Sequence, residues 1–361
     1  MITIFTPSFA DEANTNAQNL SVKEIVARLD PEQFAVTMLH QGAVDPRILS
    51  RPNTTLLQWR ARGNTVRTVW HIVRNVPDLY FFPREGPLDA AFLTLRRRLN
   101  LKTAVLSYVV SGGLHTQPYS AARMRHIREA DAVFANNTHL AELLKEKTGV
   151  KAAGIVYDGI DRRYYFAVPR ALGAGDRLTV LFAGSLRPYK RVPLVVQQAG
   201  RWPQVQFRIA GVGEEEQICR NLAKQLGCSN VDFLGHLSQA QLGEEMRRAN
   251  IFLFPSVIEG HPQVLVQAAA SGLPIVAMKV YRPDFVVDGV TGFLADNDEE
   301  FAEKFARMVE NRELRQSMAR AAVAHVQQYN WDTITRAWER AFELAVARRS
   351  KSRGLESSKR G

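Results

Sequence analysis

The sequence lacks the features of secreted, membrane-spanning and metal-rich proteins. Only two of its 361 residues are cysteines, Cys219 and Cys228, and no second Cys or His pair stands near them at zinc-site spacing. Two thiols in a chain of this size favour a reducing cytoplasm. No apolar run reaches the roughly 18 residues of a spanning helix. The start, MITIFTPSFADEA, has no basic residues ahead of an apolar core, so no signal peptide is expected.

What is present is the composition and the element pattern of a globular α/β protein. The chain is 46% hydrophobic and 23% charged, and it is long enough for two domains with cores of their own. Short apolar strands such as ITIFTP and TAVLSYVV alternate with segments of helical periodicity. This alternation predicts parallel sheets with crossover helices, and we expect the strand series to end at LPIVAM.

A change in amino-acid composition predicts a domain boundary. The segment VPRALGAGDR, which begins at Val168, is rich in Pro and Gly, as linkers are. We expect an N-terminal domain over 1–168 and a C-terminal domain over 176–332, followed by a helix at about 333–349 and a basic disordered tail over 350–361. Two such domains would leave a cleft at the carboxyl ends of their strands, where ligands bind.

The net charge of +11 is concentrated in two segments. From Pro46 to Lys102, eleven Arg and Lys residues stand against three acidic ones, and from Val346 to Gly361 six stand against one. Aromatic residues are interleaved with the first group: Trp59, Trp70, Tyr80, Phe81, Phe82 and Phe92. Basic and aromatic residues together favour an anionic membrane surface. No base-stacking module supports nucleic acid as a partner, and a solvated basic face is the alternative.

The stretch from Phe254 to Val276, FPSVIEGHPQVLVQAAASGLPIV, predicts a strand end, a loop, a short helix and a strand. Pro262 suits the first helical turn, which would leave the N–H groups of Gln263, Val264 and Leu265 free for an anion such as phosphate. Glu259 would repel phosphate but suits hydroxyl groups. The combination indicates a sugar joined to a phosphate, and a plain strand–helix connection is the alternative.

Two glycine-containing loops differ in what they predict. In FAGSLRPYKR, Gly184 allows a close backbone approach, and Arg187, Lys190 and Arg191 are suited to neutralise a diphosphate. The alternative is a surface loop with solvated charges. The segment IAGVGEEE lacks the third Gly of a dinucleotide loop, and its acids would repel phosphate, so we interpret them as first-turn acids of a helix.

Three histidines follow predicted strands and are candidates to face a ligand. They are His115 in SGGLHT, His236 in FLGHLS, and His261 beside Pro262. For a lone His, a structural role is the alternative.

Taken together, the motifs resemble glycosyltransferase family 4. FAGSLRPYKR, FRIAGVGEE, VDFLGHLS, ANIFLFPSVIEGHPQVLVQAAASGLPIVA and VVDGVTGFL stand in the order of that family between about Leu178 and Phe342. The resemblance implies the GT-B fold: two Rossmann-like domains facing across a cleft, and a last helix that returns to the first domain. It also implies retaining transfer of a hexose from a nucleoside-diphosphate sugar to a glycan or lipid-linked acceptor, in the cytoplasm or at the inner membrane face.

The resemblance also assigns roles to individual residues. His115 and Glu259 are the catalytic candidates, although Tyr108 lies nearer the place expected for the His. The expected substrate-binding residues are Gly184, Ser185, Arg187, Lys190, Gly235, His236, Glu259, Gly260, His261, Val264, Leu265 and Gln267. Lys190 would bind the diphosphate, Glu259 the hexose hydroxyls, and the loop at Gly235 the base. Because basic side chains and the helix start would take the diphosphate charge, no metal and no further cofactor are expected.

Two positions depart from the family pattern. Gln267 stands where the family has a second Glu, and Ser185 stands where it has an Arg, for which Arg187 is placed to substitute. Gln can accept hydrogen bonds from ribose hydroxyls, but without charge each bond is weaker, by about 1 kcal/mol in total. These departures leave open a non-catalytic GT-B scaffold or partner protein.

Overall fold

A computed structural model describes residues 1–13, 17–59, 63–83, 85–110, 119–169 and 177–358. The chain divides into two compact units. Of the described residues, the first unit comprises 1–110, 119–158 and 332–358, and the second unit comprises the rest of the chain from Gly159 to Trp331.

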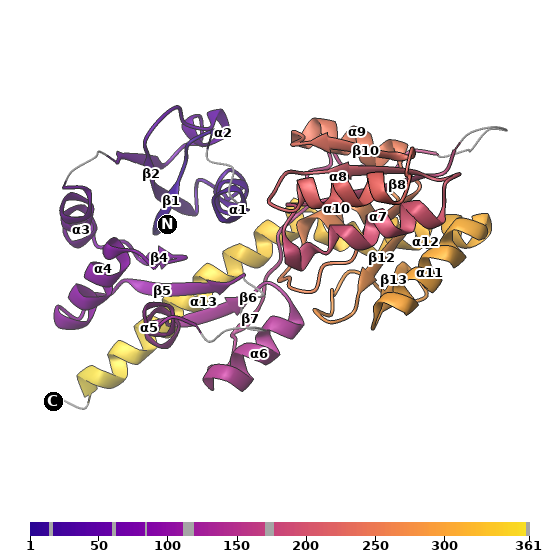
Figure 1. Cartoon of the computed structure of the whole chain (residues 1–361). Helices are drawn as coiled ribbons and strands as arrows, with labels where there is room; N and C mark the ends of the chain where they lie inside the picture. The colour runs from indigo at the N-terminus through magenta and orange to yellow at the C-terminus, as the bar shows by residue number, and fades with distance from the viewer. Residues whose placement is uncertain (14–16, 60–62, 84, 111–118, 170–176, 359–361) are drawn as a thin grey trace. The chain divides into compact units, whose positions relative to one another are not determined.

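The first unit is built on a seven-stranded sheet in which every pairing is parallel (Figure 1). The strand order is β3-β2-β1-β4-β5-β6-β7. The strands are β1 Ile2–Phe9, β2 Phe34–His40, β3 Thr54–Gln58, β4 Leu79–Phe81, β5 Ala104–Val109, β6 Ala132–Ala135 and β7 Gly154–Ile155. The helices are α1 Ala17–Val26, α2 Pro46–Leu49, α3 Asn64–Asn75, α4 Pro87–Arg98, α5 Ala121–Glu129, α6 Thr138–Thr148 and α13 Trp331–Ser358.

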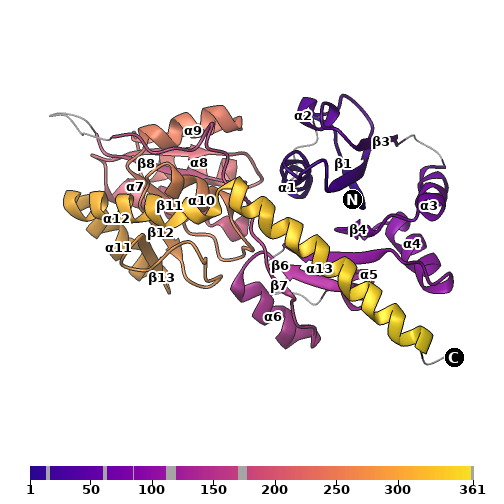
Figure 2. The same cartoon turned by 180° about the vertical axis from the view of Figure 1, so that it is seen from behind.

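The last helix, α13, lies along this sheet (Figure 2). The Trp338 ring packs edge-on against Tyr108 with centroids 4.7 Å apart, and its indole N–H donates to the carbonyl of Tyr157 at 3.2 Å. Phe342 packs against Phe81 at 4.8 Å. The helix continues to Ser358, so the expectation of a disordered tail from residue 350 is wrong over 350–358.

The second unit contains a six-stranded parallel sheet in the order β10-β9-β8-β11-β12-β13 (Figure 1). Its strands are β8 Thr179–Ala183, β9 Gln206–Ala210, β10 Val231–Gly235, β11 Ile251–Phe254, β12 Ile275–Met278 and β13 Gly292–Ala295. Its helices are η2 Pro188–Lys190, α7 Val192–Arg201, α8 Glu216–Gln225, α9 Gln239–Arg248, α10 Gln263–Ala270, α11 Asp298–Glu310, α12 Arg312–His325 and η3 Val326–Tyr329. The predicted parallel α/β class is confirmed, but β13 follows LPIVAM, so the expected end of the strand series is wrong.

Polar side chains at the helix starts explain where several helices begin. Ser238 accepts from the N–H of Gln241 at 3.3 Å, and the Gln241 side chain reaches back to the Ser238 N–H, which forms a capping box for α9. Asn297 caps α11, whose first turn is acidic, as the helix dipole favours. These signals are local, and they lie in the sequence.

The division between the units falls earlier than the boundary expected at Val168. Ile160 forms a parallel bridge with Asn330 and donates its N–H to the carbonyl of Tyr329 at 2.9 Å. Arg247 donates to the carbonyl of Tyr164 at 2.7 Å. Residues 160–164 are therefore attached to the second unit, ahead of the Pro/Gly segment.

The basic and aromatic segment of the first unit is partly interior, which corrects the expected membrane-facing patch. Four of its six aromatic residues are core residues: Tyr80, Phe81, Phe82 and Phe92 are at most 4% exposed. Arg51 and Arg96 are also buried, and they donate to backbone carbonyls such as those of Phe34 (2.8 Å) and Thr103 (2.8 Å). Charge counted along the sequence therefore overstates the charge on the surface.

What remains exposed is a smaller surface on α3, α4 and α13, which we name the α3/α4 surface. On α3, Trp70 is 58% exposed and the Arg74 guanidinium lies 5.1 Å from its ring centroid. Arg97 and Arg98 are exposed at the end of α4, where Arg349 of α13 donates to the carbonyl of Leu101 at 2.7 Å. The two basic segments of the sequence thus meet. Within the described residues, no helix is both long and apolar enough to span a bilayer.

Candidate functional site

The strand order of the second unit creates a switch point between β8 and β11. After β8 the chain adds β9 and β10 on one side, and it then returns to place β11 on the other side. In open parallel sheets, ligands bind outside the carboxyl ends of the strands at such a point. The segments that leave these ends are residues 184–191 after β8 and 255–262 after β11.

Backbone and side-chain bonds join these two loops. The carbonyl of Tyr189 accepts from the N–H of Val257 at 3.0 Å, and the hydroxyl oxygen of Ser256 lies 3.3 Å from the same carbonyl oxygen. Ser256 is fully buried. The loops are consequently held as one structure, although 67 residues separate Tyr189 from Ser256 in the sequence.

Lys190 and Glu259 meet where the loops join. The Lys190 ammonium lies 2.5 Å from Glu259 Oε1, and the Ser256 hydroxyl donates to the same oxygen at 2.5 Å. Both charged side chains are only 11% exposed. The ammonium also lies 4.8 Å from the centroid of the Phe254 ring, within cation–π range. A cation and a carboxylate thus stand side by side in a nearly buried position.

The glycines of IAGVGEEE allow the loop after β9 to contact the loop after β8. A Cβ on Gly211, whose φ is +134°, would lie 1.8 Å from the carbonyl oxygen of Gly184. A Cβ on Gly213 would lie 2.4 Å from the carbonyl oxygen of Leu186. The acids follow at the start of α8, with Glu216 in its first turn. The interpretation of these acids as helix-start residues is confirmed for Glu216, and the glycines let the loop after β9 pack on the loop after β8.

The start of α10 differs in detail from the prediction. Pro262 is the N-cap residue and the helix begins at Gln263. The Leu265 N–H donates to the Pro262 carbonyl at 2.9 Å, so the expectation that it is free is wrong. The N–H groups of Gln263 and Val264 open the first turn and have no intrahelical acceptor. One of the three backbone donors expected for an anion is therefore already bonded within the chain.

The other two basic residues of the loop after β8 differ in exposure and in partner. Arg187 is exposed, whereas Arg191, at φ +55°, forms an ion pair with Asp298 of α11. Ser185 is half-buried, and its carbonyl accepts from the Arg187 N–H at 3.0 Å. Lys190 is therefore the basic side chain that faces Glu259.

The remaining predicted residues lie around the same edge of the sheet or outside the described residues. Gly235 ends β10 at φ +67° and accepts from the Gly211 N–H at 2.7 Å, and His236 after it is exposed. Gln267 is half-buried in α10. His115 lies outside the described residues. Their binding roles stay predictions.

His261 lies in an aromatic environment. Its ring packs edge-on against Phe285 at 4.9 Å and lies 6.2 Å from Tyr329, and the residue is 8% exposed. Burial lowers the pKa of His261 to about 3. The side chain is therefore neutral at physiological pH.

Tyr281 was not predicted from the sequence. It follows β12, the neighbour of β11, and it is 0% exposed. Its hydroxyl has no hydrogen-bond partner among the residues that the structure describes. Burial, and after it the charge of Glu259, raise the pKa of Tyr281 well above its ordinary value. The only sequence signal is a tyrosine soon after a predicted strand, which is too common to single out.

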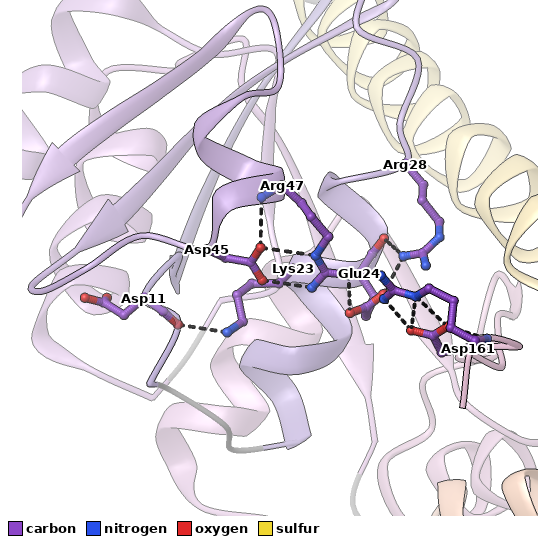
Figure 3. A network of polar contacts seen from close by, with 8 residues as sticks. Asp11, Lys23, Glu24, Arg28, Asp45, Arg47 and Asp161 are labelled. Atoms are coloured by element: carbon purple, nitrogen blue, oxygen red, sulfur yellow. Dashed lines mark hydrogen bonds and ion pairs between the residues drawn. The ribbon is translucent and has the colours of Figure 1, made fainter. Parts of the chain in front are cut away.

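The first unit has a polar network of its own at the carboxyl ends of β1 and β2 (Figure 3). Lys23 of α1 is 2% exposed and donates to the carbonyl of Asp11, after β1, at 2.8 Å. The Asp11 carboxylate accepts from the N–H of Gln41, after β2, at 2.9 Å. Arg47 joins Asp45 (2.8 Å) and Glu24 (2.7 Å). Burial is the main cause that lowers the pKa of Lys23.

This network was also not predicted, although a signal exists. Asn19, Lys23 and Val26 are spaced so that they share one face of α1, and all three are buried. A lysine on the inward face of a helix is unusual enough to indicate a buried polar contact. Among the described residues, no three His, Cys, Asp or Glu side chains gather as a metal centre would require.

Comparison with known proteins identifies the second unit. Residues 168–325 match the family model described as "Glycosyl transferases group 1". The chain carries a group 1 glycosyltransferase domain. This confirms the resemblance to family 4 over the region that holds Lys190 and Glu259.

Curated relatives of this glycosyltransferase domain are similar over part of their length. A D-inositol 3-phosphate glycosyltransferase of Mycobacterium leprae is 30% identical over 251 residues, which cover 63% of this chain and 58% of that protein. The chain spans 40% to 60% of the length of the curated relatives that it matches.

Solved structures establish the fold around this domain. A sucrose-phosphate synthase of Thermosynechococcus elongatus matches with a TM-score of 0.77 at 17% identity, over 96% of this chain and 100% of that one. Anabaena HepE, in complex with UDP and glucose, matches with a TM-score of 0.74 at 17% identity, over 95% and 100%. The two Rossmann-like parallel-sheet units have the GT-B fold.

Proposed function

We propose that the protein is a retaining glycosyltransferase that moves a hexose from a nucleoside-diphosphate sugar to a hydroxyl of a glycan or lipid-linked acceptor. The observation that carries the proposal is the contact of Lys190 with Glu259 at the switch point of the glycosyltransferase domain. A cation suited to a diphosphate and a carboxylate suited to hydroxyls are the two groups that a sugar diphosphate requires side by side.

In this proposal Lys190 and the start of α10 bind the diphosphate. An ammonium has three N–H donors and no acceptor, so Lys190 can pass from Glu259 to a phosphate oxygen or contact both. The N–H groups of Gln263 and Val264 add the donors of a helix start. These groups would stabilise the departing diphosphate, so catalysis rests on positioning and charge stabilisation and needs no metal.

The remaining contacts of the donor are divided among three elements. Glu259 accepts from hexose hydroxyls, and Gln267 of α10 accepts from ribose hydroxyls without charge. The exposed loop at Gly235 and His236 borders the base. Anabaena HepE, which has the same fold, is in complex with UDP and glucose, and this supports a nucleotide sugar as the class of donor.

The acceptor side belongs to the first unit in our proposal, and the α3/α4 surface brings this unit to an anionic membrane. Exposed Trp70 beside Arg74 combines an amphipathic ring with a positive charge, as interfacial helices do. Vesicles with a third of phosphatidylglycerol should sediment the protein at low salt. Trp70→Ala with Arg74→Glu should weaken this binding several-fold, and absence of sedimentation by the wild-type protein would remove the membrane proposal.

The function is tested with a panel of nucleotide sugars and their nucleoside diphosphates. Binding is measured by calorimetry, and transfer or slow hydrolysis is measured by release of the nucleoside diphosphate. At least one donor should bind and react, and the anomeric configuration of the product should equal that of the donor. Binding without turnover toward any acceptor would favour the non-catalytic scaffold, and no binding at all would overturn the proposal.

A further inference from the structure

The Tyr281 hydroxyl is a buried donor with no acceptor. The residue is 0% exposed, and its ring packs edge-on against Phe254 with centroids 6.5 Å apart. A hydroxyl that loses water and gains no hydrogen bond lowers stability. Two other buried tyrosines do have acceptors: Tyr80 donates to Asp89 at 2.7 Å, and Tyr108 donates to the Val156 carbonyl at 2.8 Å. A buried, unbonded polar group at a functional edge calls for an explanation.

The charged group that acts on Tyr281 is Glu259. Tyr281 follows β12 and Glu259 follows β11, so both leave the carboxyl edge of adjacent strands. Their electrostatic interaction is the second cause, after burial, of the raised pKa of Tyr281. Phe254 contacts both Tyr281 and Lys190: the Tyr281 ring packs edge-on against the Phe254 ring, and the Lys190 ammonium lies 4.8 Å from the Phe254 ring centroid. Tyr281 and Lys190 therefore both lie against the Phe254 ring, and Lys190 in turn pairs with Glu259.

The bonds of Glu259 are unevenly distributed. Lys190 and Ser256 both donate to Oε1, and both distances are 2.5 Å. If a diphosphate draws Lys190 away, the carboxylate is left with the Ser256 hydroxyl while it is still nearly buried. A carboxylate in that position needs a replacement donor.

We propose that the Tyr281 hydroxyl is this replacement: it donates to the Glu259 carboxylate when Lys190 turns to the donor diphosphate. Tyr281 is then a positioning residue that acts through Glu259, and the inference rests on the proposed function. The exchange gives the carboxylate a protein donor in place of Lys190, in addition to the hexose hydroxyls from which it accepts in the proposed function. It also keeps Glu259 aimed at the hexose after its ion pair has opened.

The test is Tyr281→Phe, which removes only the hydroxyl. In the unliganded protein the hydroxyl has no partner, so the melting temperature should stay the same or rise. Affinity for a nucleoside diphosphate and for its nucleotide sugar should fall roughly ten- to a hundred-fold, the value of one hydrogen bond to a charged group. The pair used is the nucleotide sugar of the panel that binds the wild-type protein best, with its own nucleoside diphosphate.

A double-mutant cycle with Glu259→Ala identifies the partner. Without the carboxylate, Tyr281→Phe should no longer change the affinity. The matched control is Tyr80→Phe, which breaks an existing bond to Asp89 in the first unit. That variant should lower the melting temperature and leave nucleotide binding unchanged.

Three results would overturn the inference alone: unchanged affinity in Tyr281→Phe, an equal loss in the Glu259→Ala background, or a melting temperature that falls as in Tyr80→Phe. If the wild-type protein binds no nucleoside diphosphate and no nucleotide sugar, the proposed function fails, and the inference fails with it.

Discussion

Two nearly buried lysines, one in each unit, reach the carboxyl-end loops of a parallel sheet and are held in different ways. Lys23 is 2% exposed and donates to a backbone carbonyl, that of Asp11. Lys190 pairs with the Glu259 carboxylate, and both side chains are 11% exposed. The carbonyl that holds Lys23 is part of the chain and cannot be exchanged for a ligand. The carboxylate that holds Lys190 can be left for another anion.

The difference teaches how a buried lysine is assigned a role. Burial alone does not separate the two, and neither does position at a strand end. What separates them is the partner: Lys23 has a fixed neutral acceptor, and Lys190 has a charged partner, which is the basis of the ligand-binding role that we propose for it. Variants of the two lysines should therefore affect different measurements.

The largest effect is expected from Lys190→Ala on binding. Loss of a charge-assisted contact to the diphosphate should weaken nucleoside-diphosphate binding by roughly ten- to a hundred-fold, that is about 1.5–3 kcal/mol. Calorimetry measures this. Lys224→Ala, at the exposed end of α8, is the control and should bind normally. An unchanged dissociation constant for Lys190→Ala would remove the distinction between the two lysines.

Lys23→Met should reverse the pattern. It should lower the free energy of unfolding by about 2 kcal/mol, because the Asp11 carbonyl and nearby carboxylates lose their buried donor. Urea denaturation measures the loss. Arg28→Met, which breaks a partly exposed i,i+4 pair with Glu24, should cost less than about 1 kcal/mol. A folded Lys23→Met protein with weakened nucleotide binding would show that Lys23 also acts on the ligand.

His261 provides a third case, that of a buried base in the aromatic environment of Phe285 and Tyr329. Its pKa is lowered to about 3 from 6.5. Below pH 6.5 the His261 side chain binds a proton in the unfolded state but not in the folded state. The free energy of unfolding therefore keeps its full value above pH 6.5 and decreases as the pH falls below it.

His261→Gln should therefore flatten the acid side of the stability curve. Between pH 7 and pH 5 the wild-type protein should lose about 2 kcal/mol more than the variant. Urea titrations at pH 5, 6, 7 and 8 measure this, and the difference between the two proteins should be constant from pH 7 to 8. Parallel curves down to pH 5 would mean that the folded protein protonates His261 normally.

Much of the second unit could be predicted from the sequence because its signals are local. Apolar strands, glycine turns and helix starts alternate, and the strand order alone brings the loops of Lys190 and Glu259 together. β13, which begins at Gly292, was missed because the strand series was expected to end at LPIVAM. In the fold Gly292 allows close pairing, since a Cβ there would lie 2.4 Å from the Ile275 carbonyl oxygen.

The rest of the site and of the first unit could not be predicted because orientation decides it. Tyr80 and Arg96 belong to the basic and aromatic segment by sequence, but both are buried in the fold. Lys23 is notable because its acceptor, the Asp11 carbonyl, lies on a different segment. Tyr281 is notable because no described segment supplies an acceptor for its hydroxyl. Neither composition nor periodicity carries that information.

The smallest effect is expected from Gln267→Glu, and it sharpens the distinction between fixed and exchangeable contacts. A carboxylate would accept more strongly from ribose hydroxyls, so donor affinity should rise about five-fold, or about 1 kcal/mol. Gln263→Glu, one helical turn earlier in α10, is the matched control: its added charge lies at the diphosphate end and should not improve affinity. If Gln267→Glu leaves affinity unchanged while the wild-type protein turns over, the uncharged residue does not contact the ribose. If Gln267→Glu makes an inactive wild-type protein active, the natural protein is a non-catalytic scaffold, and Gln267 is the cause of its inactivity.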